Sequence, residues 1–345
     1  MPEPLLPNPF DPPSHEHTAY ESCLNLETSG PWDLSSEPAA MYRFSPQVAA
    51  RVLGYALIYH PGSSMAMSRE ISGCGDNAEF MAGLGYLYVM GVIRMFKGPV
   101  PTRRVQPESP PENIDITALS NLSQYTGSDT KRLVLARDNH RCILSGNVDA
   151  TSLWNELTTI DLAAGERKAD MELCYIFKMT GDENQGYIGG GLTDAARRKL
   201  RWASSAAAVL ERLAGISVVQ DIHEAENTFV ISPNLHGPWD RLWISLHPIK
   251  SKQDDSSNTY EIHTYPPHEN AEYGFPYQIT LTDTTGRKTP LPSRAYFQLY
   301  DVCAKIAYLS GAGEVMERLV WEVGNARDGR DGGLLALALC LSRSE

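Results

Sequence analysis

The sequence has few basic residues for its length, and this shortage limits the partners that the protein can bind. Its 345 residues include 30 Lys and Arg against 42 Asp and Glu, which gives a formal net charge of −12. Proteins bind DNA largely by neutralising its phosphates with Lys and Arg side chains. An acidic protein can carry a local basic patch, but its overall field opposes nucleic acid. We therefore expect no nucleic-acid partner.

The sequence also lacks the cysteine pairs and long apolar runs that define other classes. Its six cysteines are far apart and form no Cys-x-x-Cys pair, so a zinc ribbon is not indicated. In a chain of this length they are typical of reduced thiols in a cytoplasmic or nuclear protein. The N-terminus has no apolar region of the kind found in signal peptides. Because no apolar run approaches the ~20 residues of a membrane span, we expect neither secretion nor a membrane partner.

The composition that remains is that of a globular protein with a sizeable core. Hydrophobic residues make up 42% of the chain and charged residues 21%, which is ordinary for folded domains. Residues 1–40 are rich in Pro, Ser and Glu, which predicts a flexible arm. Residues 41–97 are predicted to be helical, and the Pro-rich segment 98–127 to be a linker. Residues 128–345 are predicted to form an α+β domain that ends in helices.

Helix and strand signals support this α+β assignment. Ser45 as N-cap and Pro46 in the first turn begin a predicted helix. The predicted helices span 45–62, 76–96, 193–215 and 291–314. Short β-prone runs predict strands within 171–179, 226–231, 258–265 and 276–283.

Three short segments carry the pattern that points to a function. In "ENTFVISPNLHGPWDRL" (226–242), an Asn precedes a short strand, a turn at Ser232-Pro233 and a helix that carries His236. Trp239 and Trp243, four residues apart, are expected to share one face of that helix. Earlier in the chain stand "RDNHRCILSG" (137–146) and the β-prone "LCYIF" (173–177).

The order of these segments resembles the HNH endonuclease domain of fungal, basidiomycete-like proteins. The segment 137–146 is similar to the Arg-Asp-Gly-x-Arg-Cys run that opens that domain, and 173–177 to its Ala-His-Ile-Phe strand. The segment 226–248 is similar to its Asn-strand-His-helix half, and 291–314 to its Pro-Ser helix ending in Ser-Gly-Ala. The resemblance covers about residues 40–315. It implies an HNH-like ββα core, built around one divalent metal, within 128–345.

The resemblance implies a site that is degenerate at one catalytic position. It assigns Asn227 to the Asn that holds the loop and His236 to the metal-binding His on the helix. The first His, the general base, is replaced by Tyr175. A phenol with a pKa of ~10 is protonated where an imidazole with a pKa of ~6.5 can act as a base, and such a base is typically worth ~10²–10⁴ in rate. We therefore expect nuclease activity to be lost unless another histidine, such as His223, takes over.

Without its metal, the site would be a cleft with a few polar groups, which suits a small-molecule substrate. Tyr175 would act as a hydrogen-bond donor, His236 as an acid or base, and Asn227 would complete the catalytic set. The expected binding residues are His223, Cys174, Trp239 and Asp240. Each of these side chains can also be interpreted as purely structural, either holding a loop or packing in the core.

The function expected from this pattern is the binding or conversion of a small molecule by a cyclase, isomerase or pericyclase of fungal secondary metabolism. A non-catalytic pseudo-nuclease that serves as an interaction module, and a working metal-dependent nuclease, are the alternatives. No cofactor is expected unless nuclease activity survives, in which case His236 would help to hold a divalent metal.

Overall fold

The computed structural model describes residues 2–28, 45–59, 64–75, 77–97, 126–155, 166–178, 216, 222–249, 258–267, 274–286 and 289–317. They form helices and small β-sheets, so the predicted α+β class is confirmed. The chain divides into two compact units. Of the described residues, unit 1 holds 2–97, 216 and 302–317, and unit 2 holds 126–178 and 222–301.

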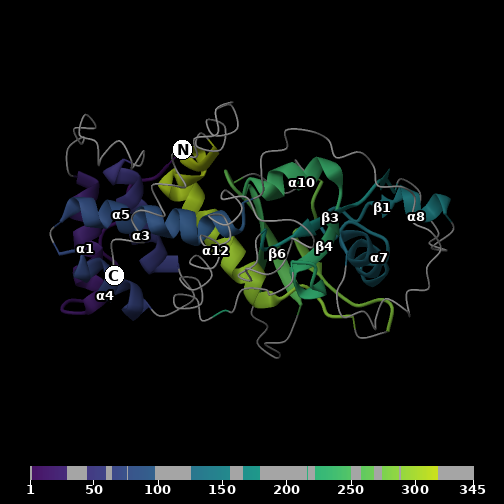
Figure 1. Ribbon diagram of the computed structural model, residues 1–345, viewed down its shortest axis with the longest axis horizontal. Helices are drawn as coiled ribbons and strands as arrows, with labels where there is room; N and C mark the ends of the chain where they lie inside the picture. Colours follow the sequence, from purple (N-terminus) through teal and green to yellow (C-terminus); the bar gives the residue numbers. More distant parts are fainter. Residues whose placement is uncertain are drawn as a thin grey trace, which may run out of the picture. The chain divides into compact units, whose positions relative to one another are not determined.

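Unit 1 is helical. Its elements are α1 (His15–Thr28), α3 (Pro46–Tyr59), α4 (Ser64–Gly73), α5 (Ala78–Gly91) and the 3-10 helix η1 (Ile93–Met95) (Figure 1). The predicted helices at 45–62 and 76–96 are confirmed by α3 and α5, whereas α4 was not predicted. A Cβ atom on Gly85 of α5 would lie 2.8 Å from the Cβ of Ala49 in α3. The glycine therefore lets these two helices pack closely.

The N-terminal segment packs into unit 1, so the prediction of a flexible arm is wrong for residues 2–28. Helix α1 buries its apolar residues along one face: Ala19, Tyr20, Cys23 and Leu26. The Glu27 carboxylate accepts the backbone N–H of Leu5 at 3.0 Å and the Arg51 Nε at 2.6 Å. The prolines that suggested an arm precede this helix, and composition alone did not show the apolar stripe behind them.

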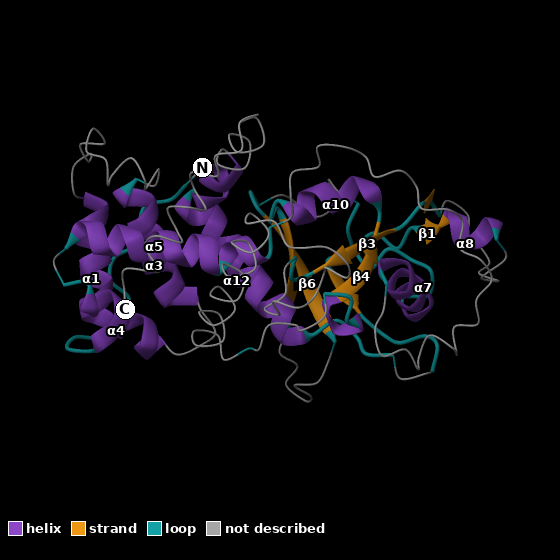
Figure 2. Ribbon diagram, in the orientation of Figure 1, coloured by secondary structure: helices purple, strands orange, loops and turns teal. Residues whose placement is uncertain are grey.

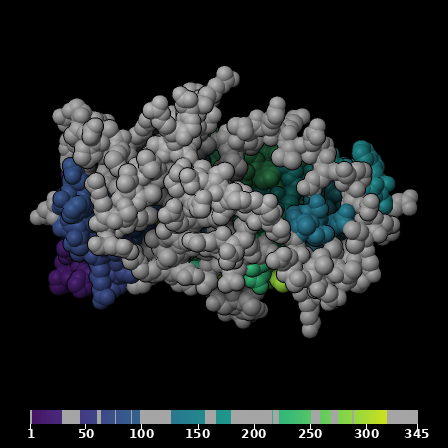
Figure 3. Space-filling view, viewed as in Figure 1, coloured from purple at the N-terminus to yellow at the C-terminus, as the bar shows by residue number. Residues whose placement is uncertain are grey.

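Unit 2 contains every strand that the structure describes (Figure 2). In chain order its elements are α7 (Gly127–Arg137), β1 (Val148–Asp149), α8 (Ala150–Trp154), β2 (Lys168–Ala169), β3 (Glu172–Tyr175), η2 (Ala225–Asn227), β4 (Thr228–Ile231), α10 (Pro233–Asp240), β5 (Ile244–Pro248), β6 (Thr259–Thr264), β7 (Gln278–Thr280) and the start of α12 (Arg294–Ser310). The segment that contains α8, teal in Figure 3, reaches the surface, and Trp154 at its end is 80% exposed.

The strands of unit 2 form three small sheets. Strands β1 and β2 pair in parallel, β3 and β4 pair antiparallel, and β5, β6 and β7 form an antiparallel sheet in that order. The strands predicted within 171–179, 226–231, 258–265 and 276–283 are confirmed by β3, β4, β6 and β7. Strand β5 was not predicted. Helix α10 ends at Asp240, so Trp243 lies outside it and the expected shared face with Trp239 does not form.

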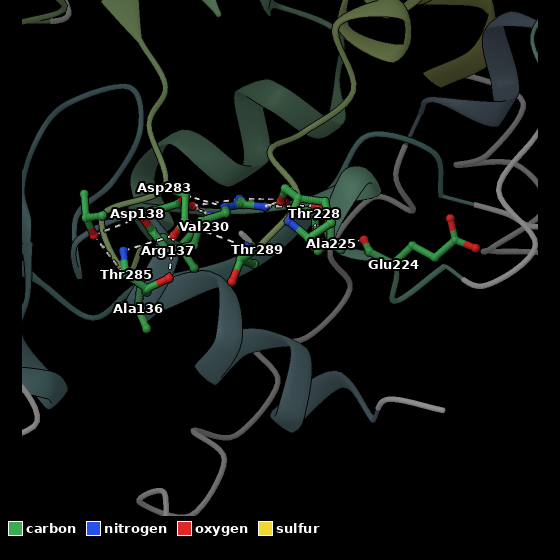
Figure 4. A network of polar contacts seen from close by, with 12 residues as sticks. Ala136, Arg137, Asp138, Glu224, Ala225, Thr228, Val230, Asp283, Thr285 and Thr289 are labelled. Atoms are coloured by element: carbon green, nitrogen blue, oxygen red, sulfur yellow. Dashed lines mark hydrogen bonds and ion pairs between the residues drawn. The ribbon is translucent and has the colours of Figure 1, made fainter. Parts of the chain in front are cut away.

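Helices α7 and α10 lie on opposite sides of the β3–β4 pair (Figure 1). On the α10 side, an aromatic cluster joins the helix to β4 and α12: Phe229, Trp239, Phe297 and Tyr300. Beside the sheet, the last residue of α7, Arg137, donates hydrogen bonds to carbonyl groups of three segments: Ala225, Thr228 and Pro290 (Figure 4). These contacts fix the sheet and the chain that leads into it.

Some predicted segments lie outside the described residues, namely the helix at 193–215 and linker residues 98–125. Among the described residues, no helix is both long enough and apolar enough to cross a membrane.

Candidate functional site

Strand β3 carries its side chains on two faces, and this alternation decides which predicted residues meet. Cys174 pairs with Phe229 of β4, whose ring lies 4.8 Å from that of Trp239 on α10. Cys174 therefore lies on the α10 face, while Tyr175 lies on the other face, because successive strand residues alternate. His236 belongs to α10. The predicted pairing of Tyr175 with His236 in one cleft is consequently wrong.

Tyr175 instead pairs with His223. The Tyr175 Oη lies 3.1 Å from His223 Nδ1, and the two rings meet edge to face with centroids 5.7 Å apart. The Thr130 hydroxyl of α7 donates to the His223 carbonyl at 3.1 Å. Gly127 begins α7 beside this pair, and a Cβ there would lie 3.6 Å from the Tyr175 Oη. The first turn of α7 thus adjoins a tyrosine–histidine pair.

Asn227 is fully buried and joins the chain after β3 to the chain before β4. Its Nδ2 donates to the carbonyls of Phe177 at 3.1 Å and Ile222 at 3.0 Å, and its Oδ1 accepts the Phe177 N–H at 2.7 Å. The side chain satisfies three backbone groups. The two of Phe177 are buried, and leaving either without a partner would cost ~1–3 kcal/mol. Asn227 is therefore a loop-holding residue.

His236 is held between two carboxylates on the other face. Its Nδ1 lies 2.6 Å from Glu172 Oε2, and its Nε2 lies 3.7 Å from Asp240 Oδ1. Burial would lower the pKa of the imidazole, but the Cys174 sulfur, the Glu172 hydrogen bond and the Asp240 charge outweigh burial and raise it to about 10. The hydrogen bond from His236 in turn lowers the pKa of Glu172. The raised pKa favours the imidazolium form of the ring, with both nitrogens protonated, at neutral pH.

Cys174, His236 and Asp240 could hold a metal ion by their chemistry, since their ligand atoms lie within 4.8 Å of one another. Lys178, however, places its Nζ 2.6 Å from Asp240 Oδ1 and 3.7 Å from the Cys174 Sγ. The contact with Asp240 Oδ1 is an ion pair without hydrogen-bond geometry. Metal binding requires a deprotonated imidazole, and a divalent ion here would face the ammonium group. The residues therefore do not fit a divalent metal in this arrangement.

Two predicted binding residues have structural roles. Trp239 is fully buried, stacks on Tyr300 at 4.2 Å between ring centroids and donates its Nε1–H to the Tyr175 carbonyl at 3.4 Å. It belongs to the core, so the prediction that it lines a cleft is wrong. Cys174 is also fully buried, although its sulfur contacts Lys178. The other two predicted binding residues do contact polar groups. Asp240 lies beside His236 and Lys178 on the α10 face of the β3–β4 pair, and His223 pairs with Tyr175 on the other face.

Sequence reasoning missed Glu172 and Lys178. Glu172 could have been found, because period 2 in a strand puts it on the same face as Cys174. Lys178 lies beyond the end of β3, where the chain direction is not readable from a periodic pattern. A third polar cluster, formed by His247, His263 and Asp301, was also missed.

The chain was also compared with known proteins. No family model, curated protein or solved structure matches it at a significant level.

Proposed function

We propose that this chain is an HNH-like ββα scaffold that has replaced its metal with an internal ammonium group and does not cleave nucleic acid. The observation that carries the proposal is the position of Lys178, 2.6 Å from Asp240 Oδ1 within the cluster that could otherwise bind an ion. Its ammonium group contributes the positive charge that Asp240 needs. A divalent ion would then have to displace it.

The local architecture supports the resemblance to HNH domains. Two antiparallel strands, β3 and β4, are followed directly by helix α10, and the order of elements is therefore ββα. Asn227 stands just before the second strand and holds the chain after the first. His236 stands on the helix. These three features correspond to the Asn, the metal-binding His and the hairpin that the sequence resemblance implies.

Three features oppose phosphodiester chemistry on this scaffold. The first His of the motif is replaced by Tyr175, and that side chain lies on the α7 face. A metal would have to displace the proton that the raised pKa of His236 favours. The net charge of −12 repels the phosphate backbone. The loss of the base alone would lower the rate by ~10²–10⁴.

We expect the purified full chain to show no metal-dependent nicking of supercoiled plasmid with Mg²⁺, Mn²⁺, Ni²⁺ or Zn²⁺. The measurement is agarose-gel conversion of plasmid to the nicked form, with His236→Ala assayed in parallel. Any trace activity that is equal in both proteins is contamination. Nicking by the wild type that His236→Ala removes would overturn the proposal.

The Lys178→Met variant tests the cause of this inactivity. In the variant, Cys174, His236 and Asp240 no longer face an ammonium group, and we expect Co²⁺ to bind with a sulfur-to-metal charge-transfer band. The wild type should lack that band. Cys174→Ser in the Lys178→Met background is the matched control and should remove it. A band of equal strength in the wild type would mean that Lys178 does not exclude the metal.

The pair formed by Tyr175 and His223 favours a second function, the binding or conversion of a small molecule. A hydroxyl 3.1 Å from an imidazole nitrogen can pass a proton to or from that ring. Tyr175 would donate its proton to a carbonyl oxygen of the substrate while water takes a proton from the α-carbon. His223 would return a proton to Tyr175 and regain one from solvent. This differs from the sequence-based hypothesis, which paired Tyr175 with His236.

For this second function we expect Tyr175→Phe to lower kcat for an enolisable carbonyl substrate by at least ~10²-fold, the lower value for a lost acid–base group. The experiment is a turnover screen of cyclisation and isomerisation substrates, followed by kinetics of Tyr175→Phe and His223→Gln. Equal loss in both variants supports a shared proton path. Turnover unchanged in Tyr175→Phe rejects the pair. A screen with no turnover would favour the interaction module.

A further inference from the structure

Three side chains from three elements of unit 2 converge away from the β3–β4 pair. His247 lies on β5, His263 on β6 and Asp301 on α12. His247 Nδ1 lies 2.9 Å from Asp301 Oδ2, and His263 Nδ1 lies 3.1 Å from Asp301 Oδ1. The two imidazole rings are nearly parallel, with centroids 4.9 Å apart. The two oxygens of the Asp301 carboxylate thus each form a hydrogen bond with one histidine ring.

The strand register explains why these histidines meet. His247 is paired with Glu261, and Ser245 with His263, in the antiparallel ladder of β5 and β6. Residues opposite each other, and residues two apart along a strand, share a face of the sheet. The side chains of Ser245, His247, Glu261 and His263 therefore lie on one face of the sheet. Asp301 contacts that face. The position of the two histidines depends on the pairing of β5 with β6, whose paired residues here are 14 to 18 apart in the sequence. The position of Asp301 depends on α12, which comes later in the chain.

We propose that His247, His263 and Asp301 bind a divalent first-row transition-metal ion through the two imidazole Nδ1 atoms and the Asp301 carboxylate. Two histidines and one carboxylate are a frequent ligand set for zinc and for non-haem iron. Ligand atoms ~2.1 Å from one ion, at angles between a right angle and the tetrahedral angle, lie ~3.0–3.4 Å apart. The two nitrogen–oxygen distances here come close to that range, 2.9 Å from His247 Nδ1 to Asp301 Oδ2 and 3.1 Å from His263 Nδ1 to Asp301 Oδ1.

The groups around these ligands would orient them for a metal. The hydroxyls of Ser245 and Tyr265 both donate to Asp301 Oδ1, Tyr265 at 3.2 Å, and so fix the carboxylate plane. Glu261 Oε2 lies 3.7 Å from His263 Nε2. This ion-pair contact favours a proton on the distal nitrogen and so leaves Nδ1 as the ligand atom. Ligands supported in this way are typical of metal sites.

Access and charge also suit an ion at this position. The side chains of His247 and His263 are 48% and 35% exposed, while that of Asp301 is 6% exposed. The ligands can thus be reached from solvent, and the anionic one is shielded. Within the described part of the chain, the groups that bond to Asp301 include no Lys or Arg. This cluster differs in that respect from the one around Lys178.

The test is metal binding by the full chain after removal of metals with a chelator. We expect one equivalent of Zn²⁺ to bind at this site, measured by competition with a chromophoric chelator. Co²⁺ should give d–d absorption without a sulfur charge-transfer band, because no cysteine belongs to the site. His247→Ala should weaken the affinity at least ~100-fold, and Glu261→Gln, which changes an outer group, ~10-fold.

The controls separate this site from other histidines and from misfolding. His15→Ala, at an exposed position in the first turn of α1, and His236→Ala should both keep the wild-type affinity. His247 is nearly half exposed, so His247→Ala should keep the wild-type circular dichroism even if His263→Ala does not. Binding that His236→Ala weakens and His247→Ala does not would overturn the assignment, as would a wild type that binds no Zn²⁺. Neither outcome depends on the nicking result.

Discussion

Replacing Arg137 with methionine is expected to lower the free energy of unfolding by about 3–5 kcal/mol, the usual cost of removing one partner of a buried ion pair. The Arg137 side chain is fully buried, and its Nε lies 2.7 Å from Asp138 Oδ1. Its Nη2 donates to Asp138 Oδ2 at 3.1 Å and to the Thr228 carbonyl at 2.9 Å. Its Nη1 donates to the carbonyls of Ala225 and Pro290, both at 2.9 Å (Figure 4).

The cost arises from the groups that the substitution leaves behind. The Asp138 carboxylate, 5% exposed, would lose its counter-charge, and burial already raises the pKa of this carboxyl. The three carbonyls would each lose a charge-assisted donor in the interior. Arg137→Lys should recover only part of the loss, because one ammonium group cannot reproduce a planar fork of five N–H donors.

The measurement is urea unfolding of the full chain followed by circular dichroism. Arg132→Met makes the same substitution on the same helix at a half-buried position with none of these bonds, and should change stability by less than ~0.5 kcal/mol. The double variant Arg137→Met with Asp138→Leu should be more stable than Arg137→Met alone, because it removes the unpaired charge. A loss of under ~1 kcal/mol in Arg137→Met would show that water or another group replaces the guanidinium.

The helices and strands that were predicted correctly are those whose own residues carry a recognisable pattern, such as a helix cap or an alternation of apolar and polar residues. Helix α3 begins at Pro46 after Ser45, and α10 begins at Pro233 after Ser232, as the cap and first-turn residues indicate. Strand β6 alternates buried and half-buried residues along its length, which is the pattern that period 2 detects. Strand β5 buries four of its five residues, and a short apolar run of that kind does not distinguish strand from helix.

The candidate site was only partly predictable because its parts are joined by tertiary placement. The resemblance singled out Asn227 and His236, and the structure places Asn227 at the end of η2, before β4, and His236 in α10. Matching by motif put Tyr175 with His236, but strand alternation separates them. Lys178 follows the end of β3, and its side chain contacts Asp240. No sequence motif marks this position. The cluster at Asp301 needs a strand register and a helix position, which no local pattern encodes.

Raising the pH from 6.5 to 9 is expected to destabilise the wild type by up to about 3 kcal/mol through His236 alone. The folded-state pKa of this imidazole is about 10, above its ordinary value. A raised pKa means that the charged ring stabilises the fold fully below the unfolded-state pKa of ~6.5, and that this contribution is lost as the pH rises toward the folded-state value. Each pH unit in that window is worth ~1.4 kcal/mol, and partial solvent exposure lowers the sum.

His236→Asn should remove this part of the pH dependence. In urea unfolding at pH 6.5, 7.5, 8.5 and 9, the wild-type free energy should fall steadily while the variant's falls much less. His263, whose pKa is raised by its hydrogen bond to Asp301, adds a slope of the same sign in both proteins, so it cancels in the difference. Work above pH 9 is avoided because burial raises the pKa of thiols such as Cys23, which ionise on unfolding. Equal slopes in the two proteins would mean that Cys174, Glu172 and Asp240 do not hold His236 as an imidazolium. Its imidazole would then be free to bind a metal, and the nuclease hypothesis would regain its ligand.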